Sequence, residues 1–214
     1  MMDKEQVIGR IERRGVVAVV RAKDAEEAVR IAEACLAGGV EAMEITFTVP
    51  GAHRVIEQLA ARYTDGAMLI GAGTVLDPET ARIAILSGAQ YVVSPSLNVE
   101  TVRLCNRYRI ASMPGAMTIR EVVEAMEVGA DIIKVFPGEL YGPKVIKAIH
   151  GPLPQAKIMP TGGVSVENAG EWIRAGAVAL GAGSSLVAGA RTGDFAAVTQ
   201  CARAFIEAVA QARA

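Results

Sequence analysis

Eight short apolar runs, each followed by a stretch with helical periodicity, limit the possible folds of this chain more than any other feature. Runs that lack polar alternation are typical of strands buried on both faces, as in parallel sheets covered by helices. Their alternation with helices predicts an α/β fold, and their number predicts a closed (β/α)8 TIM barrel. The runs occupy residues 16–20, 42–47, 68–75, 91–95, 110–116, 131–137, 157–163 and 177–180.

Glycines recur where alternate helices are expected to end. A glycine just past a helix supplies the left-handed conformation of a C-cap. The spacing is about two strand–helix units each time, which is a quarter of an eight-unit fold. The competing fold is an open doubly wound sheet, which we rank lower because no Gly-x-Gly-x-x-Gly follows the first run. The four segments are Ala37-Gly38-Gly39-Val40, Ser87-Gly88-Ala89-Gln90, Val128-Gly129-Ala130-Asp131 and Ala175-Gly176-Ala177-Val178.

The rest of the chain adds a helix at each end. The pattern predicts an amphipathic helix over residues 3–14, before the first run, and a long closing helix over 194–210. Thr118 followed by Glu121 matches a capping box at a helix start. No linker or low-complexity segment divides the 214 residues. We therefore expect one domain, residues 1–214, built as a barrel with an extra N-terminal helix.

Composition excludes several classes of partner. The net charge is −1 and no basic block is present, so neither nucleic acid nor an anionic membrane is an expected partner. No apolar run approaches the ~20 residues of a membrane span, and the first residues lack the apolar segment of a secretion signal. Cys35, Cys105 and Cys201 fall in apparent helices without paired spacing. This pattern favours a reducing cytoplasm over a disulfide framework.

A lysine stands inside the sixth apolar run. Lys134 lies in the middle of residues 131–137. An ammonium group is costly to bury, and a buried amine that becomes neutral is a nucleophile. We hypothesise that Lys134 attacks a carbonyl group and forms a Schiff base. The alternative is a lysine that reaches solvent from a strand end or pairs with a carboxylate.

Polar residues fall at or near the ends of the other runs as well. In a barrel, functional residues gather at the carboxyl ends of the strands. We therefore expect these side chains to line one pocket, although each alone also fits a solvated strand end. They are Arg21, Glu44, Thr74, Ser94, Lys134, Thr161 and Ser184.

Glu44 is the second candidate catalytic residue. It lies within residues 42–47, where burial would raise the pKa of its carboxyl group. A carboxylate and a lysine that face one cavity supply a proton shuttle and a nucleophile. The alternative is a structural ion pair of Glu44 with Lys134 or with Arg21. Arg21 is also a candidate to bind a substrate carboxylate.

Glycine-rich loops follow the seventh and eighth runs. Residues 160–164 contain Gly162 and Gly163, and residues 181–185 contain Ser184. Glycine lets backbone N–H groups approach an anion, and the loops after strands seven and eight commonly bind phosphate in this fold. The sequence therefore predicts a phosphate site here. A metal site is not expected, because His53 and His150 are the only histidines and we place both on the surface, away from the strand ends.

These residues carry a resemblance to a known family. The chain resembles the class I 2-keto-3-deoxy-6-phosphogluconate (KDPG) aldolases, also described as 4-hydroxy-2-oxoglutarate (KHG) aldolases, nearly from end to end. The motifs that carry the resemblance are Glu44-Ile45-Thr46-Phe47-Thr48-Val49-Pro50, Gly71-Ala72-Gly73-Thr74-Val75, Ser94-Pro95, Met113-Pro114-Gly115, Ile133-Lys134-Val135-Phe136-Pro137 and Pro160-Thr161-Gly162-Gly163.

The resemblance implies a role for each matching residue. Lys134 would form the Schiff base and Glu44 would act as the general acid and base. The pyruvate part of the substrate would be surrounded by Arg21, Thr74, Pro95 and Phe136. Thr161 would also bind substrate, and the distal phosphate would be held by Gly162, Gly163 and Ser184. The family further implies a homotrimer, a small 2-keto acid as the partner, and no cofactor or metal.

Position 48 differs from part of this family. Some members have an arginine there that assists anion binding, whereas this chain has Thr48. The distal phosphate would then rely on backbone N–H groups and Ser184. The related galactonate branch shares most of the motifs, so 2-keto-3-deoxy-6-phosphogalactonate is an alternative substrate. Two further alternatives are a phosphate-binding isomerase or epimerase, and a catalytically inactive barrel used for ligand binding or assembly.

Overall fold

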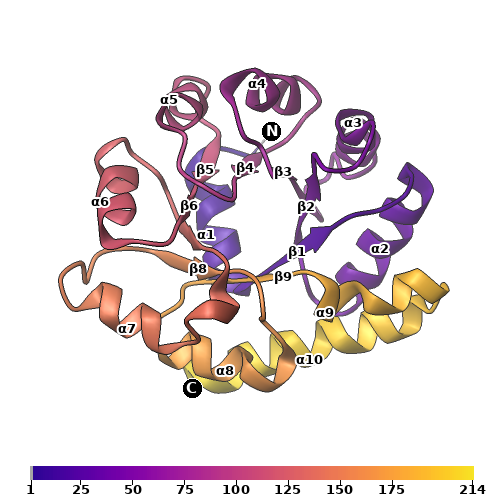
Figure 1. Ribbon diagram of the computed structural model, residues 1–214. Coiled ribbons are helices and arrows are strands. Elements are labelled where there is room, and N and C mark those ends of the chain that lie inside the picture. The colour runs from indigo at the N-terminus through magenta and orange to yellow at the C-terminus, as the bar shows by residue number, and fades with distance from the viewer. Residues whose placement is uncertain (1) are drawn as a thin grey trace.

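The computed structural model describes residues 2–214 as parallel strands surrounded by helices (Figure 1). The strands are β1 Val16–Val20, β2 Ala42–Thr46, β3 Leu69–Gly73, β4 Tyr91–Val93, β5 Ala111–Met113, β6 Gly115–Ala116, β7 Ile133–Val135, β8 Ile158–Pro160 and β9 Leu180–Ala182. The helices are α1 Lys4–Arg14, α2 Ala25–Ala37, α3 Ala52–Arg62, α4 Pro78–Leu86, α5 Val99–Arg107, α6 Ile119–Glu127, α7 Lys144–His150, α8 Val166–Arg174, α9 Ser184–Val187 and α10 Phe195–Arg213, with 3-10 turns at Gly138–Leu140 and Ala188–Thr192.

The strands form a curled parallel sheet in two hydrogen-bonded parts. One part has the order β5-β4-β3-β2-β1-β9 and the other has the order β6-β7-β8. The first strand, β1, therefore pairs with the last strand, β9, as well as with β2. This order contradicts the open doubly wound sheet, in which the chain reverses direction from a central first strand. An isolated parallel bridge between Thr161 and Gly181 also links the end of β8 to β9.

Both faces of the curled sheet are buried, as expected for parallel strands covered by helices. Every residue of β1, β2 and β3 is buried. Alternate residues enter two separate apolar clusters because successive side chains of a strand point to opposite faces. The outer cluster packs under the helices and includes Val16, Ala18, Val20, Met43 and Ile45. The inner cluster on the concave face includes Val17, Leu69, Tyr91, Ala111, Met113 and Met159.

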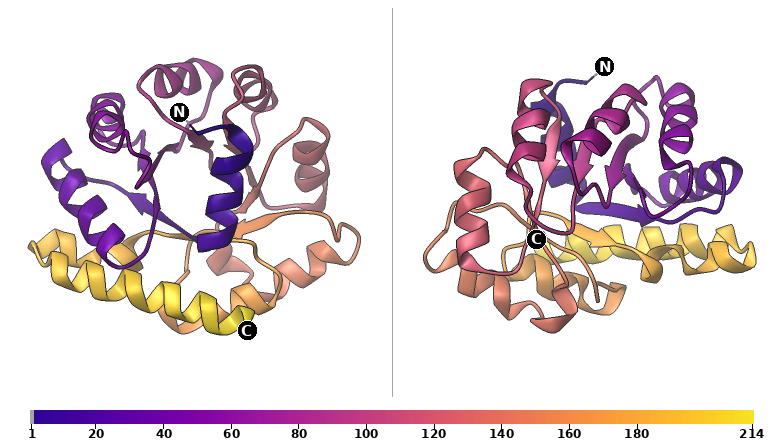
Figure 2. Two further views of the ribbon diagram at one scale, coloured as in Figure 1. Left: turned by 180° about the vertical axis from the view of Figure 1, so that it is seen from behind. Right: turned by 45° about the horizontal axis from the view of Figure 1, so that its top comes forward.

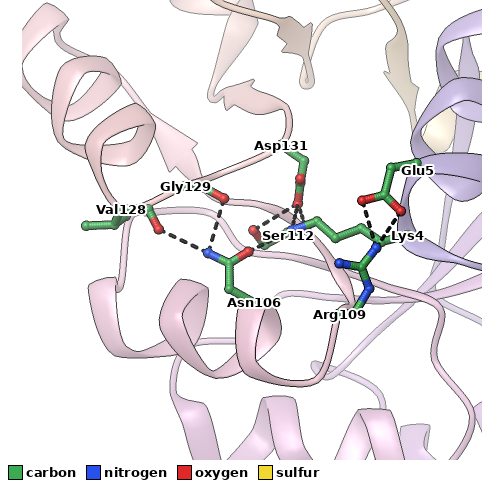
Figure 3. A network of polar contacts seen from close by, with 8 residues as sticks. All are labelled: Lys4, Glu5, Asn106, Arg109, Ser112, Val128, Gly129 and Asp131. Atoms are coloured by element: carbon green, nitrogen blue, oxygen red, sulfur yellow. Dashed lines mark hydrogen bonds and ion pairs between the residues drawn. The ribbon is translucent and has the colours of Figure 1, made fainter.

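Helix α1 covers the concave face at the amino-terminal ends of the strands, as Figure 2 shows from behind. Its Val7 and Ile11 are buried in the inner cluster. A polar network fixes its first turn (Figure 3): Lys4 Nζ lies 3.0 Å from Asp131 Oδ2 and donates to Asn106 Oδ1 at 2.6 Å. Asp131 also accepts from the backbone N–H of Ser112 at 2.8 Å. This end of the sheet is thus closed by apolar packing and by a largely buried ion pair.

Several local expectations are confirmed and others need correction. Thr118 and Glu121 form the predicted capping box of α6. The last strand is Leu180–Ala182 rather than residues 177–180, because Gly181, which resembles part of a loop in the sequence, lies in extended backbone beside β1. The fifth apolar run is divided into β5 and β6 at Pro114, which has no N–H to donate. The closing helix continues to Arg213.

Within the described residues, no helix is both long enough and apolar enough to span a membrane. The three cysteines lie in α2, α5 and α10, and all three are free thiols.

Candidate active site

A cavity of about 570 Å³ opens at the carboxyl ends of the strands, on the side opposite α1. Of the site residues predicted from the sequence, all except Glu44 and Ser94 line it. Additional wall residues come from the turn after β7 and from the segments that follow β8 and β9. The lining residues are Val19, Arg21, Thr48, Thr74, Pro95, Lys134, Phe136, Glu139, Thr161, Gly162, Gly163, Val164, Ser165, Gly181, Gly183, Ser184 and Ser185.

Lys134 lies at the centre of β7 and faces this cavity. It is 5% exposed, and its Cα partners across the sheet are Gly115 of β6 and Met159 of β8. Its Nζ lies 5.1 Å from the centroid of the Phe136 ring, within the range of a cation–π contact. The amine therefore sits on a rigid strand, in an apolar wall, with its reactive atom next to open space.

Glu44 lies beneath the cavity on β2 and is 1% exposed. Neither carboxylate oxygen has a hydrogen-bond partner. This contradicts the alternative in which Glu44 is held as a hydrogen-bonded ion pair by Lys134 or Arg21. Burial raises the pKa of Glu44, and the positive charges of Lys134 and Arg21 offset only part of the rise. A raised pKa brings a carboxyl group closer to neutral pH, where it can both accept and return a proton.

Strand β3 makes room for this carboxyl group. A β-carbon at Gly73 would lie 2.6 Å from Oε1 of Glu44, closer than any side chain allows. The following residue, Thr74, has φ 56°, a left-handed conformation that is unfavourable for a β-branched residue. Such strain is found mainly at functional sites, and Thr74 lines the cavity.

The two glycine loops meet at one end of the cavity. Gly162 and Gly163 have φ values of 90° and 68°, which favour glycine. A β-carbon at Gly181 would lie 2.1 Å from Thr161 Oγ1, so the close approach of β8 and β9 also requires glycine. Backbone N–H groups of these loops can approach an anion without obstruction from side chains.

Some residues lie differently from the predictions. Ser94 is buried and donates to the carbonyl oxygen of Ser96 at 2.7 Å, so it is not part of the cavity wall. The two histidines, expected at the surface, are half-buried, and His150 Nε2 lies 2.9 Å from Ala156 O. Among residues 2–214, no three His, Cys, Asp or Glu side chains converge in a way that could hold a metal ion.

Sequence reasoning missed Glu139, which lies in the turn after β7. It lines the cavity, and a β-carbon at Gly163 would lie 2.6 Å from its Cβ. Arg21 and Lys134 are the cationic lining residues, and Glu139 is the acidic one. Its position two residues after Pro137 was a usable signal, because the segment after a barrel strand contributes to the site.

Comparison with known proteins identifies the family. The profile of the KDPG and KHG aldolase family matches residues 7–201. The chain belongs to this aldolase family. Aldolases are lyases, and this aldolase is 35% identical over 198 residues to the 2-dehydro-3-deoxy-6-phosphogalactonate aldolase of Escherichia coli K12, covering 92% of this chain and 95% of that protein. It is 34% identical over 203 residues to the 2-dehydro-3-deoxy-phosphogluconate aldolase of Treponema pallidum, covering 93% and 95%.

A solved structure gives a matching result. The KDPG aldolase of Legionella pneumophila, with pyruvate captured at low pH as a covalent carbinolamine intermediate, superposes with a TM-score of 0.86 at 30% identity. The match covers 92% of this aldolase and 97% of that chain.

Proposed function

We propose that this aldolase cleaves KDPG to pyruvate and glyceraldehyde 3-phosphate through a Schiff base on Lys134. The observation that carries the proposal is a buried lysine facing a cavity, above a buried carboxyl group without a hydrogen-bond partner. Lys134 supplies the nucleophile and Glu44 supplies the proton transfer. The substrate carboxylate would lie beside Arg21, the other cationic residue of the wall.

The first half of the reaction forms a protonated imine, which accepts the electron pair of the C3–C4 bond when that bond breaks. The amine of Lys134 adds as its free base to the C2 ketone and forms a carbinolamine, which takes up one proton from solvent and loses water to give a protonated imine. Glu44 then removes the proton of the C4 hydroxyl group. The C3–C4 bond breaks, its electron pair moves to the imine nitrogen, and glyceraldehyde 3-phosphate leaves. The pyruvate enamine stays attached to Lys134.

The second half restores the enzyme. Glu44 returns its proton to C3 of the enamine, which becomes the imine of pyruvate. Water hydrolyses this imine, so that pyruvate leaves and Lys134 is free again. Each proton taken by Glu44 is given back, and hydrolysis of the imine returns to solvent the proton that imine formation consumed.

The distal phosphate would be held by backbone N–H groups of Gly162 and Gly163 together with Ser184. The same cavity suits the shorter substrate KHG, which would yield pyruvate and glyoxylate. The likeness to the Escherichia coli enzyme keeps 2-keto-3-deoxy-6-phosphogalactonate as the alternative substrate.

Four broader proposals accompany this function. Residues 1–214 form a single domain, and the two sheet parts form one (β/α)8 barrel, which the Thr161–Gly181 bridge supports. The protein acts in the cytoplasm, which its three free thiols favour. The aldolase works as a homotrimer, an expectation that comes from the family resemblance.

Trapping with borohydride tests the mechanism. Reduction in the presence of pyruvate should add a stable covalent mass to the peptide that contains Lys134. The Lys134→Ala variant should lose the adduct and lose turnover, measured as pyruvate release coupled to lactate dehydrogenase. Lys147→Ala, at an exposed lysine on α7, is the matched control and should behave as wild type. Normal turnover by Lys134→Ala would refute the proposal.

The same assays separate the alternatives. An isomerase or epimerase would convert sugar phosphates without a trapped adduct or released pyruvate. An inactive barrel would bind ligand and release nothing. Rates on KDPG, its galactonate epimer and KHG would establish the substrate preference.

A further inference from the structure

The row of residues that contains Glu44 crosses three neighbouring strands. In the register of the sheet, the Cα of Glu44 on β2 is paired with that of Gly71 on β3. Gly71 is paired in turn with Tyr91 on β4. The Glu44 and Tyr91 side chains both point to the concave face, with only a glycine between them. A side chain from either neighbouring strand, β2 or β4, can therefore extend into the space over Gly71.

Tyr91 fills this space. A β-carbon at Gly71 would lie 2.3 Å from both Cε2 and Cζ of the Tyr91 ring. The far end of the ring thus lies over β3, roughly one strand spacing of ~4.8 Å from the Tyr91 backbone. Because the hydroxyl group extends beyond Cζ, the ring directs it across β3 toward β2, the strand that carries Glu44.

Both groups are fully buried and lack partners. Tyr91 is 0% exposed and Glu44 is 1% exposed, and neither the phenol oxygen nor the two carboxylate oxygens has a hydrogen-bond partner. A buried polar group without a partner destabilises the folded state, and more so if it is charged. The Tyr91 hydroxyl group is thus an unpaired donor and the Glu44 carboxylate an unpaired acceptor, and the two residues lie in the same row of the sheet. Burial, together with the nearby Glu44 carboxylate, raises the pKa of Tyr91 well above its ordinary value, so the phenol stays protonated and can donate.

We infer that Tyr91 is a positioning residue for Glu44, whose phenol O–H donates to the ionised carboxylate, directly or through one bound water. The inference rests on the proposed function, because it concerns the residue that transfers the proton. The charged groups that face Glu44 from other elements are Lys134 of β7 and Arg21 after β1. Tyr91 contributes what these cations do not, a neutral donor on the side of the carboxylate away from the substrate.

Removing only the hydroxyl group tests this role. Tyr91→Phe keeps the ring that packs over Gly71. We expect kcat to fall about tenfold, a part of the 10²–10⁴ typical of general acid–base catalysis, with little change in KM. Without the donor, the ionised form of Glu44 is less stable. The acidic limb of the kcat–pH profile should therefore move to higher pH.

Two readouts separate the proton step from imine formation. Exchange of the pyruvate methyl protons with D2O, followed by NMR, requires Glu44 and should slow in Tyr91→Phe. Borohydride trapping at Lys134 should proceed as in wild type. Adding Tyr91→Phe to a Glu44→Gln background should have no further effect on exchange, since the acceptor is already neutral. Tyr63→Phe removes a half-buried phenol at the end of α3 and should leave all readouts unchanged.

Each outcome has one meaning. Wild-type enzyme that neither exchanges pyruvate protons nor traps the adduct would refute the proposed function itself. Active wild-type enzyme, together with a Tyr91→Phe variant that has an unshifted pH profile and normal exchange, would overturn the inference while leaving the function intact. If Tyr91→Phe lowers the melting temperature, the exchange and pH measurements are made below its unfolding transition, where the same two results decide.

Discussion

The carboxyl group of Glu44 lies against Gly73 on the adjacent strand, beside the place where any other residue would put its β-carbon. The distance from that position to Oε1 is 2.6 Å. One strand thus carries the acid–base group, and its neighbour supplies the space that this group needs. The orientation of Glu44 depends on the absence of a side chain at residue 73.

Adding one methyl group should therefore disable the site. In Gly73→Ala, the Glu44 carboxyl group must turn away from its present position. We expect kcat to fall by about 10²-fold, because general acid–base catalysis contributes 10²–10⁴. Steady-state kinetics measure this loss, and borohydride trapping should show that Lys134 still forms its adduct. Gly9→Ala is the matched control, since nothing lies within 4 Å of a β-carbon there. A fully active Gly73→Ala enzyme would contradict this account.

Glu44 should also make stability depend on pH. Its pKa is raised in the folded protein, so the folded state binds more protons than the unfolded state between the ordinary and the raised value. The free energy of unfolding should therefore fall as pH rises through this window, and the loss should be complete above the raised pKa. Glu44→Gln should be inactive and, at neutral pH, more stable than wild type by an amount on the order of 1 kcal/mol or more.

Urea unfolding at several pH values measures this effect. The difference between Glu44→Gln and wild type should shrink toward acidic pH, where the wild-type carboxyl group is neutral as well. A difference that stays constant with pH would show that the substitution acts through packing instead of charge.

Thr48 offers a way to change substrate preference. It is exposed, lines the cavity, and its Oγ1 lies 2.8 Å from Oγ1 of Thr46. Thr48→Arg adds a cation to a wall whose acidic residue is Glu139. We expect the KM for the phosphorylated substrate KDPG to fall several-fold relative to KHG, with a smaller effect at high salt because exposed charges are screened. Thr48→Val, which loses the hydroxyl contact without adding charge, should show no such change in the ratio.

The sequence was sufficient for the parts of the fold that depend on local chemistry. Apolar runs located every strand except the last, with β5 and β6 in one run, and side-chain oxygens located helix starts such as that of α6. It failed at residues 177–182, because Gly181 and Gly183 are as compatible with a loop as with a strand packed closely against Thr161. That choice depends on a contact between segments about 20 residues apart, which no local pattern contains.

The site residues, too, could be recognised from the sequence only where the local pattern was unusual. Lys134 and Glu44 were recognisable because a charged residue inside an apolar strand is rare. Tyr91 was not recognisable, because an aromatic residue in a strand is ordinary. The usable signal lay on the adjacent strand, where Gly71 and Gly73, two residues apart, leave the concave face without side chains. Only the register of β2, β3 and β4 shows which neighbours fill that space.

The hydrogen bond of Lys4 to Asn106 and its ion pair with Asp131 have a consequence for the order in which the protein folds. Lys4, in the first turn of α1, has polar partners 102 residues or more further along the chain, whereas Arg10 of the same helix pairs with the nearer Glu41. The apolar cluster that buries Val7 and Ile11 extends from Val17 to Ala179, so it is complete only when the last strands are in place. Contacts between residues this far apart in sequence form late, because closing a long loop costs entropy before the contacts stabilise it. We therefore expect the first turn of α1 to dock late in folding.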